Sequence, residues 1–303
     1  MLRTKILLAV AGCLVLTAGC AGTGSAPGAQ GGHHKIVASG KKADPSASDP
    51  SGSTPSGGTT STGSPTTVSA AQWTCASAAP PAGAGGTVVL SAPATVGSER
   101  IEAAGQATTG CVALYTLAAG ASAWQAQDVT SDASGGNGVS SLQVAAVDQD
   151  HVFVLATGLP GAGQAPAFLF MTADGGTTWA KGSTGAGSVL PHSNVPLQMA
   201  FSTAQDGWIT DLNTFYGPPR VEVYATHDGG ITWALTAFAV PDKYAAAFGA
   251  GQALPPVWQN AQQGTIKVFG TMNEVTTTLV YGTSDGGASW LLQSASQNSA
   301  TGG

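Results

Sequence analysis

Three segments of the 303-residue chain repeat one pattern, Thr-x-Asp-Gly-Gly-x-Ser/Thr-Trp, at Thr172–Trp179, Thr226–Trp233 and Thr283–Trp290. Their tryptophans lie 54 and 57 residues apart. A fourth tryptophan, Trp124, lies 55 residues before Trp179 in a degenerate copy without the aspartate. Self-similarity at a fixed period is typical of repeat architectures, in which each repeat is one small structural unit packed on its neighbours. This period constrains the fold more than any other feature.

Each period is filled by short runs of alternating apolar and polar residues separated by turn residues, which is the periodicity of β-strands. The chain has 43 glycines and 17 prolines, and 9% of its residues are charged. Because glycine and proline both destabilise helix interiors, this composition excludes a mainly helical protein. We expect four strands in each intact repeat. In the first they span 142–147, 152–157, 167–172 and 178–182, and in the second 197–202, 207–212, 221–226 and 232–240. In the third they span 257–260, 265–271, 276–283 and 289–294.

The repeated pattern predicts a hairpin turn. Asp-Gly between two strands is a strong hairpin signal, since glycine adopts positive φ at little cost. The aspartate can accept hydrogen bonds from backbone N–H groups of the turn, and the tryptophan offers a large apolar face to a neighbouring sheet. We therefore assign structural roles to Asp174, Gly176, Trp179, Asp228, Gly230, Trp233, Asp285, Gly287 and Trp290.

The three intact copies resemble the Asp-box, or BNR repeat, of sialidase-like β-propellers. The segment Phe201-x4-Asp206-Gly207-Trp208 is similar to the blade motif of photosystem II stability/assembly factor-like propellers. This resemblance implies an all-β fold, a small β-propeller of about four four-stranded blades over residues 71–298. Four blades is the low end of the known range, so a larger propeller remains the alternative.

The N-terminus has the order of a secretory signal peptide. Arg3 and Lys5 precede an apolar run that ends in Ala18-Gly19-Cys20, which resembles a bacterial lipobox. We expect residues 1–19 to be removed and Cys20 to carry the lipid of an exported membrane lipoprotein; a plain secretory signal is the alternative. Residues 20–70 are rich in Gly, Ser, Thr and Pro, which favours a disordered linker because such a stretch cannot bury enough apolar surface to fold.

Two further cysteines, Cys75 and Cys111, lie in the weakest repeat. In an exported protein an isolated pair favours a disulfide over a metal site, which would need ligands at short spacing. We expect this bond to fasten the N-terminal edge of the domain. No sequence motif predicts a metal site or a cofactor.

The loops at the end opposite the aspartate turns are where the sequence interpretation places a ligand, because binding residues concentrate on loops. An aromatic ring beside a guanidinium can hold a sugar or a carboxylate. The candidate binding residues are His192, Asn213, Tyr216, Arg220, Lys243 and Tyr244.

The number of arginines in this chain argues against sialidase activity. In the resembling enzymes three arginines hold the substrate carboxylate, whereas this chain has only Arg100 and Arg220 after the signal segment. The remaining carboxylates form no recognisable constellation, and we predict no catalytic residue. Nucleic acid binding is disfavoured because residues 71–303 hold five basic and fourteen acidic residues, a balance of −9.

The leading hypothesis is therefore a non-enzymatic, membrane-anchored lipoprotein facing outside the cytoplasm that binds a protein or a glycan. A divergent glycoside hydrolase with two carboxylates is the second hypothesis, and a structural component of the envelope is the third.

Overall fold

The computed structural model describes residues 65–130, 138–161, 165–182, 190, 197–215, 217–249 and 251–299. The chain divides into two units, Met1–Gly58 and Thr59–Gly303, and every described residue belongs to the second. The expected signal peptide, Cys20 and nearly all of the expected linker lie outside the described residues, as do His192 and Tyr216. No helix among the described residues is long and apolar enough to span a membrane.

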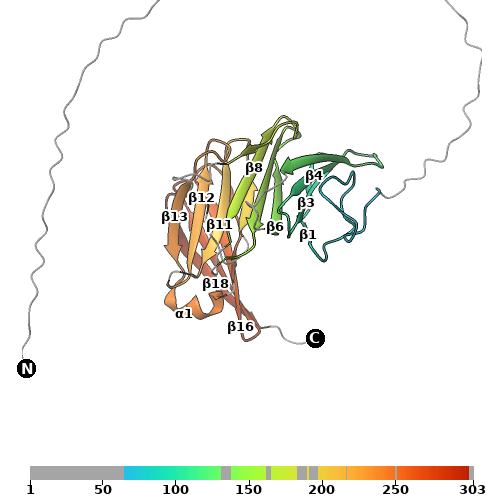
Figure 1. Cartoon of the computed structure of the whole chain (residues 1–303). Helices are drawn as coiled ribbons and strands as arrows, with labels where there is room; N and C mark the ends of the chain where they lie inside the picture. Colours follow the sequence, from blue (N-terminus) through green and yellow to red (C-terminus); the bar gives the residue numbers. More distant parts are fainter. Residues whose placement is uncertain are drawn as a thin grey trace, which may run out of the picture. The chain divides into compact units, whose positions relative to one another are not determined.

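The described domain is all-β, as predicted, and consists of four antiparallel sheets that follow one another in chain order (Figure 1). Sheet 1 has the order β1-β3-β4-β5, with β2 paired to β3, and sheet 2 has the order β6-β7-β8-β9. Their strands are β1 (Val88–Leu90), β2 (Ala94–Val96), β3 (Glu99–Gln106), β4 (Val112–Leu117), β5 (Gln125–Thr130), β6 (Val139–Ala146), β7 (His151–Gly158), β8 (Ala167–Ala173) and β9 (Ala180–Lys181).

Sheets 3 and 4 repeat this plan. Sheet 3 has the order β10-β11-β12-β13, and sheet 4 has the order β14-β16-β17-β18, with β15 paired to β16. Their strands are β10 (Gln198–Phe201), β11 (Gly207–Asn213), β12 (Arg220–Thr226), β13 (Ala234–Ala239), β14 (Gln252–Ala253), β15 (Val257–Trp258), β16 (Gly264–Met272), β17 (Val275–Thr283) and β18 (Leu291–Ser299). A meander of four antiparallel strands is the strand order of one propeller blade.

Packing between consecutive sheets forms the core, because their central strands are apolar on both faces. On β7, Val152 and Val154 pack toward sheet 1, whereas Phe153 and Leu155 pack toward sheet 3. Sheets 3 and 4 meet in the same way, with Leu212 of β11 in one cluster with residues of β16 and β17. Each sheet is thus stabilised by burial against its neighbours, and none is an independent core.

The four tryptophans of the repeats occupy the same position in the strand order of their sheets. Trp124, Trp179, Trp233 and Trp290 each directly precede the last strand of their sheet. The last three each pack into the cluster between their own sheet and the preceding one. Trp124 instead packs with Trp73 of the N-terminal segment. The degenerate copy therefore holds the same place in the strand order as the three intact ones but differs in its packing.

The N-terminal segment covers the face of sheet 1 that has no preceding sheet. Trp73 is buried there and its indole N–H donates a 2.8 Å hydrogen bond to the hydroxyl of Tyr115. The predicted disulfide between Cys75 and Cys111 is present, with Cα atoms 6.2 Å apart, and ties this segment to sheet 1. Trp73 itself lies outside the sheet strands.

The face of sheet 4 that points away from sheet 3 differs from the covered face of sheet 1. On β16, Ile266 and Val268 are buried against sheet 3, while Lys267 between them faces outward and is exposed. Its cross-strand neighbours on that face are Val280 and, beyond it, the exposed Ser294. Among the described residues, no strand of sheet 1 makes an extensive contact with a strand of sheet 4.

One expected loop has regular structure. Residues 241–256 contain the short helix α1 (Asp242–Ala245), the 3₁₀ turn η1 (Ala246–Phe248) and β14. Phe248 is fully buried and packs into the cluster between sheets 3 and 4. Pro255 and Pro256 separate β14 from β15, because proline lacks the N–H that a continuous strand would donate to β16.

Candidate functional site

The three aspartate turns share one hydrogen-bond network. In the last of them, Thr283 donates to Asp285 Oδ1 at 2.7 Å, and Ser289 donates from its backbone N–H to Oδ1 at 3.0 Å and from its hydroxyl to Oδ2 at 2.6 Å. These bonds to Ser289 and Thr283 lower the pKa of Asp285 to about 2.

The other two turns repeat the network with threonine in place of Ser289. Thr178 and Thr232 each donate from the hydroxyl to the turn aspartate at 2.6 Å. The pKa of Asp174 and that of Asp228 are lowered, chiefly by these bonds. Each carboxylate is thus engaged by hydrogen-bond donors of its own turn.

A second repeated bond joins each aspartate turn to an earlier turn of its sheet, between β6 and β7, between β10 and β11, or between β15 and β16. The backbone N–H of Gly175 donates to Asp150, that of Gly229 to Gln205 and that of Gly286 to Gln262. Gly175, Gly229 and Gly286 all have positive φ, which aims their N–H groups at those carbonyls. In sheets 2, 3 and 4 the two turns are thus joined at the same end of the domain, which we call the rim.

Three cavities lie along this rim, one at each boundary between consecutive sheets. Their volumes are about 560 Å³ between sheets 1 and 2, about 390 Å³ between sheets 2 and 3, and about 360 Å³ between sheets 3 and 4. Among these three, only the cavity between sheets 3 and 4 is lined by tryptophan, and it has two, Trp208 and Trp258. We call this cavity the aromatic pocket.

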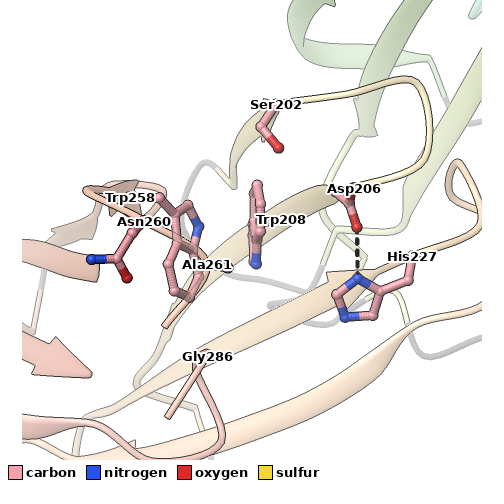
Figure 2. A pocket seen from close by; sticks show the side chains of 8 residues that line it. All are labelled: Ser202, Asp206, Trp208, His227, Trp258, Asn260, Ala261 and Gly286. Carbon is pink, nitrogen blue, oxygen red and sulfur yellow. Dashed lines mark hydrogen bonds and ion pairs between the residues drawn. The ribbon is translucent and has the colours of Figure 1, made fainter. Parts of the chain in front are cut away.

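Polar side chains surround the two indoles of the aromatic pocket. Figure 2 shows Trp208 between Trp258 on one side and the pair Asp206 and His227 on the other. His227 Nδ1 lies 2.8 Å from Asp206 Oδ1, and the hydroxyl of Thr203 donates to Asp206 Oδ2 at 2.8 Å. The bond from His227, and then that from Thr203, lower the pKa of Asp206. Ser202 and Asn260 complete the polar rim of the pocket.

Local sequence explains why Trp208 lines a cavity instead of filling the core. Its two cross-strand neighbours are Ala200 on β10 and Ala225 on β12, so no large side chain covers the indole from within its own sheet. Trp208 is half-buried and its ring centroid lies 5.3 Å from that of Trp258. The result is a flat aromatic surface open to a ligand.

The sequence interpretation identified the segment that carries this pocket but not the pocket. Asp206 and Trp208 were recognised only as part of a blade motif. The side chain of His227 is 73% exposed, yet it is bonded to Asp206 of a different turn. The sequence does not indicate which turns lie next to one another at the boundary between two sheets.

Two of the predicted binding residues, at the end of the domain opposite the aspartate turns, make structural contacts. Arg220 Nε donates to Glu222 Oε1 at 2.6 Å, and Asn213 donates to the same oxygen at 3.1 Å. Glu222 is only 3% exposed, and its other oxygen accepts a 2.7 Å bond from Tyr224. Burial, and then this bond, raise the pKa of Tyr224. Arg220 and Asn213 therefore satisfy a buried carboxylate.

Lys243 and Tyr244 lie on α1, where the Lys243 ammonium is 4.7 Å from the Tyr244 ring centroid. Among the described residues, no hydrogen bond or ion pair joins either of them to Asn213 or Arg220. The structure thus places these four candidates at one end of the domain without bringing them into a single cluster.

Two of the remaining carboxylates are neighbours in sheet 3, a pairing that no sequence motif predicted. Asp211 and Glu222 are directly opposite one another on β11 and β12, and both are buried. Sequence reasoning missed the pair because the cross-strand register, which aligns residues eleven positions apart, is set by the length of the intervening loop. No group of three or more His, Cys, Asp or Glu suited to a metal ion occurs among the described residues.

The fold and this rim define an all-β protein of four successive antiparallel sheets, each with four or five strands. No family model and no curated protein sequence matches the chain. Similar solved structures include a six-bladed β-propeller lectin from Aleuria aurantia, with 11% identity, a TM-score of 0.42 and coverage of 70% of this chain and 61% of that one. The chain thus spans about three fifths of that lectin's length.

Two enzymes are also similar in structure. The NanB sialidase from Streptococcus pneumoniae is 13% identical with a TM-score of 0.39, over 61% of this chain and 28% of that one. A GH93 α-L-arabinofuranosidase of Fusarium graminearum is 12% identical with a TM-score of 0.42, over 70% and 65% of the two chains.

Proposed function

We propose that this chain is a non-enzymatic lipoprotein, anchored outside the cytoplasm through Cys20, whose small sialidase-like propeller of four blades binds a glycan or protein partner at the aromatic pocket. The observation that carries the proposal is the pairing of Trp208 and Trp258 across the boundary of sheets 3 and 4. Aromatic faces with a few fixed polar groups are the usual lining of ligand sites.

Neither arginine of the described domain supports a sialidase-like grip on a substrate carboxylate. Arg220 is engaged by Glu222, and Arg100 donates to the buried Glu102 at 2.9 Å. An arginine bonded to a buried carboxylate of its own strand is already neutralised. This arrangement favours binding over sialidase catalysis.

The buried pair Asp211 and Glu222 is the feature that a glycosidase would need, since such enzymes use two carboxylates on either side of the scissile bond. Here both oxygens of Glu222 accept hydrogen bonds from protein groups. The side chain is also nearly inaccessible. These contacts favour a structural role for the pair.

Binding is tested by retention of the purified full chain on washed cell-envelope material. We expect Trp208→Ala to abolish retention and Phe215→Ala to leave it unchanged. Phe215 is a matched control because it is 44% exposed and lies in the β11–β12 loop, at the opposite end of the domain. Loss of retention in Phe215→Ala alone would move the site to that end. Release of reducing sugar that Glu222→Gln abolishes would establish the hydrolase instead.

Anchoring is tested separately with Cys20→Ser. We expect the unmodified chain to partition into the detergent phase of a Triton X-114 extract and the variant to partition into the aqueous phase. Partition of both into the aqueous phase would show a plain secreted protein.

A further inference from the structure

The charges around the aromatic pocket restrict which ligands it can take. Asp206 lines the pocket, whereas no lysine or arginine does. Residues 71–303 carry five basic and fourteen acidic side chains, so the field of the domain repels anions. An anionic ligand would have to meet Asp206 with only His227 to offset it. The pocket therefore favours an uncharged or a cationic ligand.

The carboxylate of Asp206 is poorly suited to a cation. Its Oδ1 is engaged by His227 and its Oδ2 by the hydroxyl of Thr203. Binding of a cation by aromatic residues favours ring faces on several sides of the charge. Here the two indoles contact one another at 5.3 Å, tilted by 40°, so they do not enclose a space between them. An uncharged ligand fits these groups better.

The polar groups of the rim suit hydroxyl groups. Ser202 can donate or accept, the amide of Asn260 donates to Gln263 and has a second N–H, and the Nε2 of His227 projects away from the Nδ1 that is bonded to Asp206. These groups line the aromatic pocket together with the flat apolar face of Trp208. A sugar ring has the complementary surface, with C–H groups on its face and hydroxyls around its edge.

Resting on the proposed function, we infer that the ligand is an uncharged saccharide, with one sugar ring stacked on Trp208 and its hydroxyls hydrogen-bonded by Ser202 and His227. The volume of about 360 Å³ lies at the small end of ligand sites, which corresponds to recognition of one or two sugar units of a longer glycan. Specificity for an uncharged sugar follows from the groups named above.

The test is isothermal titration of the full chain with trisaccharides that differ in charge. The uncharged set comprises the trimers of N-acetylglucosamine, glucose, mannose and galactose; the glucosamine trimer is the cationic probe and the galacturonate trimer the anionic one. We expect binding of at least one uncharged trimer and no binding of the charged ones. Preferred binding of either charged trimer would overturn the inference.

Variants connect the binding to the pocket. We expect Trp208→Ala to weaken it by roughly tenfold or more, Trp208→Phe to weaken it less because a flat face is retained, and Phe215→Ala to leave it unchanged. We expect His227→Lys to admit the galacturonate trimer, a change of specificity that a merely structural residue would not produce. Circular dichroism of each variant confirms folding.

The outcomes separate the inference from the proposed function. If no uncharged trimer binds but a protein of the envelope is retained in a Trp208-dependent manner, the saccharide inference is wrong and the binding function stands. If neither trimers nor envelope material are retained, both are wrong.

Discussion

Trp258 lies between two glycines and reaches Trp208 only because neither glycine has a side chain. Trp258 is paired with Gly264 across β15 and β16, and a Cβ at Gly264 would lie 2.8 Å from the indole. A Cβ at Gly287, in the aspartate turn, would lie 3.3 Å from the far edge of the same ring. The aromatic pocket therefore depends on backbone positions in two separate turns.

The first prediction concerns Gly264→Ala. The added methyl group overlaps Trp258, so we expect the free energy of unfolding to fall by about 1–3 kcal/mol and ligand affinity to fall with it. Urea unfolding measures the first effect and titration the second. Gly249→Ala is the matched control, since nothing lies within 4 Å of a Cβ there. Equal stability of the two variants would show that Trp258 moves freely and is not held by Gly264.

The second prediction concerns the acid stability of the aspartate turns. The pKa of Asp285 is about 2 in the folded chain, below its ordinary value of 3.8, because the ionised carboxylate accepts bonds from Ser289 and Thr283. A lowered folded pKa contributes stability that is present above pH 4 and is lost as the pH falls through 2. We expect the melting temperature to drop between pH 4 and pH 2.

The variant Asp285→Asn provides the control for this titration. It removes one titrating group, so we expect a lower melting temperature than the unmodified chain at pH 6 and a smaller drop between pH 4 and pH 2. The same drop in both proteins would show that Asp285 does not contribute to acid unfolding.

The third prediction concerns the disulfide. The bond between Cys75 and Cys111 closes a loop of 36 residues, for which chain entropy suggests roughly 3–4 kcal/mol of stabilisation. We expect dithiothreitol to shift the urea midpoint downward by the corresponding amount and to leave Cys75→Ala/Cys111→Ala unaffected. Because Trp73 covers sheet 1 beside this bond, its fluorescence should change first. Identical midpoints with and without reductant would rule out a stabilising role.

The strand ends of sheet 3 were predicted to within two residues and those of sheet 2 to within three, because their signals are local. The turns after Phe201 and after Thr226 each contain their own bonding groups, Thr203 and Asp228, so the strand ends are determined by nearby sequence. The position of Trp124 directly before the last strand of its sheet also followed from spacing alone.

The parts that sequence reasoning missed depend on contacts between distant segments. Nothing near Trp73 indicates that it packs under Tyr115, which is 42 residues away. The helix α1 forms in an expected loop because Phe248 at the end of the following turn is buried by sheets 3 and 4. The aromatic pocket likewise combines Trp208 and Trp258 from different repeats.

The fourth prediction tests whether ligand binding depends on the end of the domain that contains Arg220 and Glu222. Arg220 satisfies the buried Glu222, so Arg220→Met leaves a charge in the interior with one fewer partner, and we expect a loss of about 2–3 kcal/mol in the free energy of unfolding. The double variant Arg220→Met/Glu222→Met removes the buried charge as well and should recover part of this loss, because apolar residues often replace a buried ion pair without cost. Saccharide binding at the aromatic pocket should be the same in all three proteins, measured by titration. Loss of binding in Arg220→Met with stability unchanged would instead place the ligand beside the guanidinium, at the end opposite the aspartate turns.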